Sequence, residues 1–137
     1  MTLGRLNHVG VATPSIENSV AMYRDLFGAV AGEPFDLPAQ GVRVCFVDAP
    51  NSQIELIEPL GEASPIHGFL AKNPAGGQHH VCFEVADVHA AKAEMEAKGA
   101  RVLGEPRIGA HGSLVIFVHP RDMGGVLVEL MEVPAAH

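Results

Sequence analysis

The chain repeats itself, and this internal repeat constrains its fold more than any other feature of the sequence. The segment 7–12 (NHVGVA) reappears 72 residues later as 79–84 (HHVCFE), and GEP at 32–34 reappears after the same interval. VCFV at 44–47 and QIEL at 53–56 reappear as VIFV and LVEL, after 71 and 74 residues. A single match carries little weight, but four in the same order with a nearly constant offset indicate two copies of one unit.

Each copy shows the same succession of local patterns. HVGVAT and HVCFEV alternate in the manner of half-buried strands. A helix follows in each copy: Thr13 with Pro14 offers an N-cap followed by proline, and Gly28 ends the first helix. Asp87 and Gly99 bound the second helix in the same way. Three further strands are expected in each copy, at 29–35, 42–48 and 53–58 and at 101–107, 113–118 and 126–132.

These elements predict an α+β fold in which two repeated βαβββ modules form a curved mixed sheet around a metal site. The modules cover about 5–58 and 79–133, and residues 59–78, with a short helix at 65–72, link them. A module of this length is too short to bury the face of its own sheet. We therefore expect the two modules to pack about a pseudo-twofold axis as one domain, residues 1–137.

The composition fits a globular protein and excludes some partners. Hydrophobic residues make up 47% of the chain and charged residues 18%, which is enough for a packed core. The formal net charge of −7 disfavours nucleic acids and anionic membranes as partners. Cys45 and Cys82 lie within apolar runs and are expected to be buried free thiols. The sequence shows neither a leader peptide nor an apolar run that could span a bilayer, so we expect a soluble, cytoplasmic protein.

Polar residues that recur within the otherwise apolar repeated strands are candidates for a metal site. They are His8 with His80, and Glu55 with Glu129. A pseudo-twofold axis places equivalent side chains symmetrically, so the two histidines and two glutamates are expected to converge on one divalent ion. Taken singly, a histidine at a strand start is more often a hydrogen-bonded core residue, and Glu55 fits a solvated strand face. Glu129 is harder to explain without a ligand, because its strand has few other polar atoms.

The other histidines have weaker claims. His79 is adjacent to His80 and points to the opposite face of its strand, which indicates a supporting role, although an exchange of the two is an open alternative. His111, in a glycine-flanked loop (IGAHGS), is a candidate to bind substrate, and a solvated turn is an equally good interpretation. The remaining histidines are expected in turns or on the surface: His67, His89, His119 and His137.

With its paired βαβββ units and its His–Glu–His–Glu order, the sequence resembles the vicinal oxygen chelate superfamily and, more narrowly, the methylmalonyl-CoA epimerase family. The resemblance runs from LNHV at 6–9 to VLVEL at 126–130. Its most specific stretches are GGQHHVCFEV at 76–85 and GAHGSLVIFVHPRDMGGVLVEL at 109–130, with EPLG at 58–61 and SPIHGFLAKN at 64–73 in support.

The resemblance implies a function and a ligand set. His8, His80 and Glu129 would bind the metal with Glu55 as the fourth ligand, and Co²⁺ would be favoured over Zn²⁺, Ni²⁺ or Mn²⁺. The reaction would interconvert (2R)- and (2S)-methylmalonyl-CoA in propionate metabolism, by proton abstraction next to the thioester through a metal-stabilised enolate. Glu129 and Glu55 are the expected acid/base groups. The family resemblance also implies a homodimer, with an acyl-CoA substrate as its small-molecule partner.

One departure from the family pattern affects the mechanism. Some relatives carry glutamate where this chain has Val44, and a valine cannot transfer a proton. The second proton carrier is therefore Glu55, a loop group such as His111, or a water molecule. Competing functions stay open at this point: a glyoxalase I-like lactoylglutathione lyase, an extradiol dioxygenase, and a non-enzymatic ligand-binding member of the superfamily.

Overall fold

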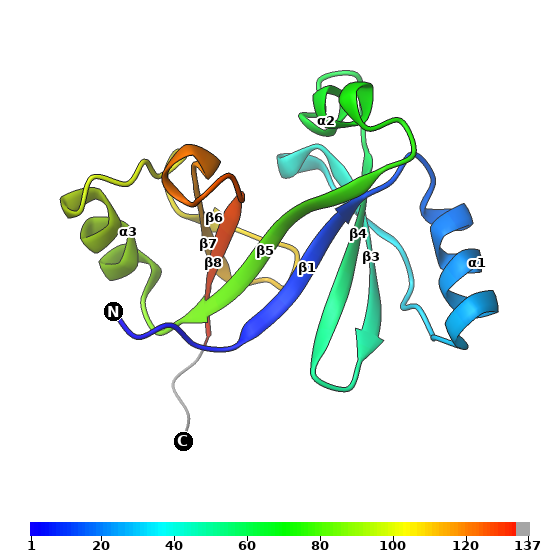
Figure 1. Ribbon diagram of the computed structural model, residues 1–137, viewed down its shortest axis with the longest axis horizontal. Coiled ribbons are helices and arrows are strands. Elements are labelled where there is room, and N and C mark those ends of the chain that lie inside the picture. Colours follow the sequence, from blue (N-terminus) through cyan, green and yellow to red (C-terminus); the bar gives the residue numbers. More distant parts are fainter. Residues whose placement is uncertain (134–137) are drawn as a thin grey trace. The chain divides into compact units, whose positions relative to one another are not determined.

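The computed structural model describes residues 1–133 and shows an α+β protein, as predicted (Figure 1). The chain divides into two compact units. The first unit contains residues 8–79, and the second contains residues 1–7 together with the chain from residue 80 onward. Each unit is built on one copy of the sequence repeat, and the two are described in turn.

The first unit holds the strands of the first repeat, the helix that lies between the first two of them, and a second, short helix after the last. Its elements are β1 (Leu6–Ala12, which starts two residues before the unit), α1 (Ile16–Phe27), β2 (Phe35–Leu37), the 3₁₀ turn η1 (Pro38–Gln40), β3 (Val42–Ala49), β4 (Ser52–Pro59) and α2 (Ile66–Lys72). The strands lie in the order β2-β3-β4-β1. The adjacent strands β1 and β4 are parallel. Strand β3 pairs antiparallel with β2 on one side and with β4 on the other.

The second unit has the same arrangement. Its elements are β5 (Gly77–Val85, which starts three residues before the unit), α3 (Val88–Ala97), β6 (Arg107–Ile108), β7 (Leu114–Val118), the 3₁₀ turn η2 (Pro120–Asp122) and β8 (Val128–Glu132). The strands lie in the order β5-β8-β7-β6. Again the first and last strands of the repeat, β5 and β8, are parallel, and the others pair antiparallel.

The strand register confirms the repeat at the level of single residues. In the first unit Gly10 of β1 is the partner of Glu55 in β4. In the second unit Cys82 of β5 is the partner of Glu129 in β8. Because the register is the same, a side chain in one unit has a definite equivalent in the other.

The helix α1 begins two residues later than the sequence predicted. Ser15, not Thr13, is its N-cap, and the Ser15 hydroxyl accepts a hydrogen bond from the Asn18 N–H group. The Thr13 hydroxyl instead donates a hydrogen bond to the Ser15 carbonyl oxygen. Pro14 lies before the helix, which begins at Ile16. The predicted end is confirmed, because Gly28 closes the helix with a φ of 65°, a conformation that glycine adopts without strain.

A glutamate of the last strand in each unit binds the start of that unit's helix. The Glu58 Oε1 atom accepts a hydrogen bond of 2.9 Å from the Ile16 N–H group. The Glu132 Oε2 atom accepts one of 3.0 Å from the Val88 N–H group. A carboxylate at this place satisfies a free N–H group and interacts favourably with the positive end of the helix. Asp87 caps the second helix, as predicted.

Two strands are shorter than the sequence predicted. The segments 29–35 and 101–107 were expected to be strands, but β2 and β6 begin only at the last residue of each segment. Before those points each segment makes a single isolated bridge. Pro34 and Pro106 immediately precede the strands, and proline has no N–H group to donate to a ladder.

Each unit has its own hydrophobic core beneath its long helix. The buried residues of the first core are Ile16, Cys45, Val47 and Leu56. Those of the second core are Val85, Val88, Ala91, Ile116, Val118, Val128 and Leu130. Cys45 and Cys82 are free and buried, as predicted.

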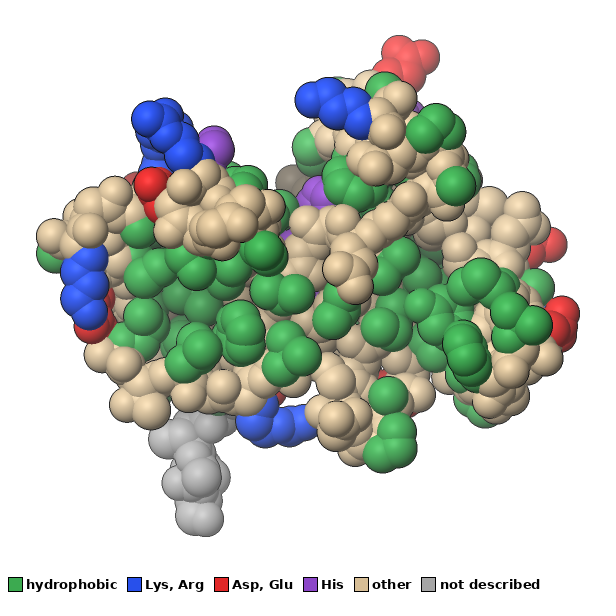
Figure 2. Space-filling model, in the orientation of Figure 1, with side chains coloured by type: hydrophobic (Ala, Val, Ile, Leu, Met, Phe, Trp, Pro, Cys, Tyr) green, Lys and Arg blue, Asp and Glu red, His purple; other side chains and the backbone are tan. Residues whose placement is uncertain are grey.

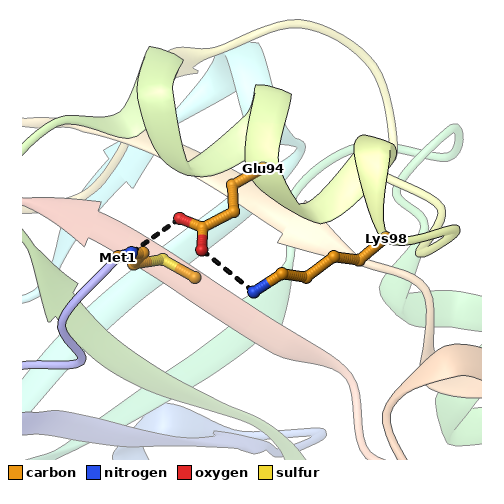
Figure 3. Close-up of polar contacts among 3 residues, drawn as sticks. All are labelled: Met1, Glu94 and Lys98. Atoms are coloured by element: carbon orange, nitrogen blue, oxygen red, sulfur yellow. Dashed lines mark hydrogen bonds and ion pairs between the residues drawn. The ribbon is translucent and has the colours of Figure 1, made fainter.

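The N-terminal segment of the second unit is attached to α3 by charged groups (Figure 3). The Met1 ammonium group lies 2.7 Å from Glu94 Oε2, and the Lys98 Nζ atom lies 3.0 Å from Glu94 Oε1. Hydrogen bonds from these two cations lower the pKa of Glu94 below its ordinary value. The interaction keeps Glu94 ionised where the segment meets the helix.

The helix α1 exposes apolar side chains on its outer surface. Hydrophobic side chains gather over this helix at the right of Figure 2, where Met22, Leu26 and Phe27 are exposed. The exposed side chains belong to a short amphipathic helix. Within residues 1–133, no helix combines the length and the apolar character needed to cross a membrane.

Candidate metal centre

The first unit brings together His8 and Glu55, two of the predicted ligands. Glu55 pairs with Gly10, which lies two residues after His8 on β1, so His8 and Gly10 point to the same face. Gly10 has no side chain to separate the imidazole from the carboxylate. The His8 Nε2 and Glu55 Oε2 atoms are 3.8 Å apart. Both residues are buried, with exposed fractions of 1% and 6%.

The second unit brings together His80 and Glu129 in the same way. Glu129 pairs with Cys82, two residues after His80 on β5. The His80 Nε2 and Glu129 Oε1 atoms are 3.3 Å apart, and both residues are buried. Each repeat therefore yields one buried imidazole beside one buried carboxylate.

A phenylalanine accompanies each of the two His–Glu pairs. Phe46 on β3 is the cross-strand partner of Glu55, and its ring meets the His8 ring edge to face at 6.3 Å. Phe117 on β7 is the partner of Glu129, and its ring meets the His80 ring at 5.8 Å, also edge to face. The rings limit the rotation of the imidazoles and shield the pairs from water, which strengthens electrostatic interactions there.

The donor atoms fit a divalent transition-metal ion. Imidazole nitrogen and carboxylate oxygen are both ligands of such ions. Two atoms at about 2.0–2.2 Å from one ion lie roughly 3.3–3.6 Å apart at the angles of a tetrahedral site. The separation of 3.3 Å between His80 and Glu129 is within this range, and the 3.8 Å between His8 and Glu55 requires only a small adjustment. Since an ion of this kind takes about four ligands, one pair alone supplies half a site.

Three other residues singled out in the sequence lie on β5, on β3 and in the loop after β6. The His79 ring packs edge to face against Phe69 of α2, with ring centroids 5.2 Å apart. Val44 is a core residue of β3, 1% exposed and paired with Ile57. His111 is exposed in the loop between β6 and β7, and its proposed contact with substrate stays a prediction.

The remaining histidines have structural or surface positions. The His119 Nδ1 atom accepts a hydrogen bond from the Arg121 N–H group and starts η2. The His67 ring contacts the Gly61 carbonyl oxygen at 2.9 Å, and His89 is exposed on α3. His137 lies outside the described residues.

Several residues beside the candidate ligands were not recognised from the sequence. Phe46 and Phe117 lie inside the repeated segments VCFV and VIFV, so their recurrence was a signal that could have found them. Gly109, which follows β6, gave no such signal. A Cβ atom there would lie 2.9 Å from Val115 Cγ1 and 3.6 Å from Glu129 Oε2. Glycine thus allows the chain to pass close to Val115, at a point beside the Glu129 carboxylate.

Comparison with known proteins places the chain in a family. The model of the glyoxalase/bleomycin resistance protein/dioxygenase superfamily matches residues 7–117. The ethylmalonyl-CoA/methylmalonyl-CoA epimerase of Cereibacter sphaeroides is 56% identical over 133 residues, which are 96% of this chain and 99% of that protein.

Solved structures agree with this relationship over nearly the whole chain. Methylmalonyl-CoA epimerase from Mycobacterium tuberculosis is 34% identical with a TM-score of 0.87, over 96% of this chain and 89% of that one. A methylmalonyl-CoA epimerase in complex with methylmalonyl-CoA and NH4+ is 39% identical with a TM-score of 0.88, over 98% and 97% of the two chains. These matches confirm the resemblance inferred from the sequence. The chain therefore belongs to the glyoxalase/bleomycin resistance protein/dioxygenase superfamily and, within it, to the methylmalonyl-CoA epimerase family of isomerases.

Proposed function

We propose that this protein is a metal-dependent epimerase that interconverts (2R)- and (2S)-methylmalonyl-CoA. The observation that carries the proposal is the buried His–Glu pair, present once in each unit in the same register. The relative from Cereibacter sphaeroides, at 56% identity, is named for epimerisation of ethylmalonyl-CoA and methylmalonyl-CoA. A related epimerase has been solved with methylmalonyl-CoA bound.

The proposed ligands of the metal are His8, Glu55, His80 and Glu129. Each pair supplies one nitrogen and one oxygen donor, and the two pairs together supply the four donors that neither provides alone. When bound, the ion supplies positive charge that stabilises the negative charge developing on the substrate oxygens. We propose Co²⁺ as the native ion, with Zn²⁺, Ni²⁺ and Mn²⁺ as alternatives, and a homodimer as the functional form. Metal analysis and sedimentation of the purified protein test these two points.

The reaction requires a proton to leave C2 on one face and return on the other. The C2–H bond breaks, the proton moves to a carboxylate oxygen, and the electron pair moves toward the thioester carbonyl oxygen. We propose that Glu129 carries the proton on one face. Glu55 is the proposed carrier for the opposite face, because it is the buried equivalent of Glu129 in the other unit. Val44 occupies a core position and has no group that can carry a proton.

Exchange of the C2 hydrogen of methylmalonyl-CoA with solvent deuterium tests the proposal. We expect the metal-loaded wild type to incorporate deuterium at C2 and the Glu129→Gln variant to be slower by about 100-fold or more, because a general base typically contributes 10²–10⁴-fold. Glu62 is an exposed glutamate outside the pairs, so Glu62→Gln is the matched control and should exchange normally. Undiminished exchange by the wild type after complete removal of metal would reject the proposed mechanism.

The same assay separates the competing functions. A lactoylglutathione lyase would act on the hemithioacetal of glutathione and methylglyoxal and would not exchange the acyl-CoA. A dioxygenase would consume oxygen with a catechol. Ethylmalonyl-CoA should be included as a second substrate, because it appears in the name of the relative from Cereibacter sphaeroides.

A further inference from the structure

We propose that Arg107 binds an anionic group of the acyl-CoA substrate, an inference that rests on the function proposed above. Arg107 is the first residue of β6 and is exposed. Its guanidinium carbon lies 5.1 Å from the centroid of the Phe117 ring. Phe117 is also the ring that packs against His80, the partner of Glu129. One aromatic ring thus adjoins both the guanidinium group and the His–Glu pair of the second unit.

The chain beyond Arg107 leads to the same carboxylate. Gly109 follows β6 directly, and a Cβ atom built on it would lie 3.6 Å from Glu129 Oε2. Arg107 and Gly109 are two residues apart on an extended segment, so their side-chain directions lie on the same face. The segment therefore presents a cation beside the group that we propose to move the proton.

Arg107 forms no ion pair with any carboxylate among residues 1–133. Glu105, two residues before it, lies 3.8 Å from the Lys92 Nζ atom instead. The guanidinium has five N–H donors in a planar fork, which matches two oxygens of a carboxylate or a phosphate. Its guanidinium group lies over the Phe117 ring, and this cation–π contact restricts where the fork can lie.

The internal repeat provides a comparison that separates packing from binding. Arg107 pairs with Val115 on β7, and Phe35 pairs with Val44 at the equivalent place in the first unit. There the Phe35 ring packs against Phe46 at 6.1 Å. An apolar ring is thus sufficient for packing at this position of the repeat. The positive charge in the second unit needs another explanation, and an anionic ligand supplies it.

The charge of the whole protein favours a local cation where an anionic substrate binds. The net charge of −7 repels an acyl-CoA, which is itself an anion. A guanidinium group near the reacting carboxylate offsets this repulsion and orients the ligand through paired hydrogen bonds. Two groups of the substrate have the required chemistry: the free carboxylate of the acyl part and the phosphates of coenzyme A.

Steady-state kinetics of Arg107→Met and Arg107→Lys test the inference. We expect Arg107→Met to raise KM for methylmalonyl-CoA by about 5- to 20-fold, with kcat much less affected. Arg107→Lys should recover only part of the loss, because it keeps the charge but not the planar pair of donors. The KM of the wild type should rise with ionic strength, and the KM of Arg107→Met should rise less. Arg24→Met is the control, because it removes an exposed arginine that, within the described residues 1–133, pairs only with its neighbour Asp25.

A second substrate distinguishes the two anionic groups. Methylmalonyl-pantetheine has the carboxylate but no nucleotide phosphates. A KM increase with both substrates assigns the acyl carboxylate to Arg107, and an increase with the coenzyme A ester alone assigns a phosphate. An unchanged KM for both substrates in Arg107→Met overturns the inference, while deuterium exchange by the wild type in the same preparation shows that the proposed function itself stands.

Discussion

In the second unit the His80 Nε2 atom lies 3.3 Å from the Glu129 Oε1 atom, and the two residues stand in the strand register that relates His8 to Glu55. A buried carboxylate is costly unless a donor or a cation faces it. In each unit a histidine imidazole lies next to the buried glutamate, so the same contact offsets the cost of burial in both. This is the relationship expected of a duplicated half-site, in which each copy keeps its share of the ligands.

If the two pairs serve one ion, removing either histidine should weaken binding of that ion. We expect wild type to bind one divalent ion per chain, and His8→Gln and His80→Gln each to lose affinity by about 100-fold or more, since even changes outside the ligand sphere cost 10–100-fold. The double variant should lose little more than either single one, because the effects of ligands of one ion are not additive. Titration calorimetry and metal analysis provide the measurements.

The alternative of two independent ions predicts a different pattern. Wild type would then bind two ions per chain, and each single variant would keep one of them with its affinity unchanged. Leu26→Ala is a suitable control, because Leu26 is an exposed apolar residue on α1 of the first unit and belongs to neither pair. It should bind metal like the wild type.

The close passage of the chain at Gly109 predicts a loss on adding a methyl group. Gly109→Ala would place its Cβ atom 2.9 Å from Cγ1 of Val115, a buried β-branched side chain that cannot move away easily. We expect a destabilisation of about 1–3 kcal/mol in urea unfolding, as for other overpacked sites. The displacement also reaches the Glu129 carboxylate, so deuterium exchange should fall in the folded variant.

Gly68 provides the matched control for this substitution. It lies in α2 without a positive φ, and no atom lies within 4 Å of its added Cβ. Gly68→Ala should therefore be neutral or stabilise the protein by about 0.5–1 kcal/mol through helix propensity. Equal effects of the two substitutions would show that the contact at Gly109 is unimportant.

Much of this architecture could be predicted because duplication is visible in the sequence. The four ligand candidates were found because they recur at equivalent positions, not because single histidines or glutamates are distinctive. The end of α1 at Gly28 was equally clear. The start of α1 was not, because Thr13 and Ser15 are both suitable caps and only their tertiary surroundings choose between them.

Other features depend on contacts between segments far apart in sequence. The role proposed for Arg107 follows from its position over Phe117, which a sequence pattern does not reveal. Gly109 looks like an ordinary loop glycine until its distance from Val115 is known. Residues 29–34 resemble a strand in sequence, yet only a single bridge forms there. Pro34 has no N–H group to donate, and the regular strand pairing begins at the residue after it.

The glutamates that bind the helix starts should contribute to stability in both units. Glu58→Ala and Glu132→Ala each remove the acceptor of a helical N–H group, from Ile16 and Val88. We expect each to lower the free energy of unfolding by about 1–2 kcal/mol, with a smaller loss for the Gln variants, which keep the acceptor oxygen. Chemical denaturation measures this, with the exposed Glu62→Ala as control. A loss no larger than that of the control would mean that solvent replaces these bonds without cost.

The buried thiol of Cys45 should make stability fall at alkaline pH. Burial, together with the nearby Glu33, raises the pKa of Cys45, and its Sγ–H group donates to the Gly32 carbonyl oxygen at 3.3 Å. The folded state therefore holds this proton more tightly than the unfolded state. Its contribution is complete below the ordinary thiol pKa of about 8.5 and is lost as pH rises through the folded pKa. The free energies of unfolding of the wild type and of Cys45→Ala should differ by a constant amount below about pH 8. Above that pH the wild type should lose stability relative to the variant. Parallel pH profiles up to the alkaline limit of folding would show that folding does not raise the pKa of Cys45.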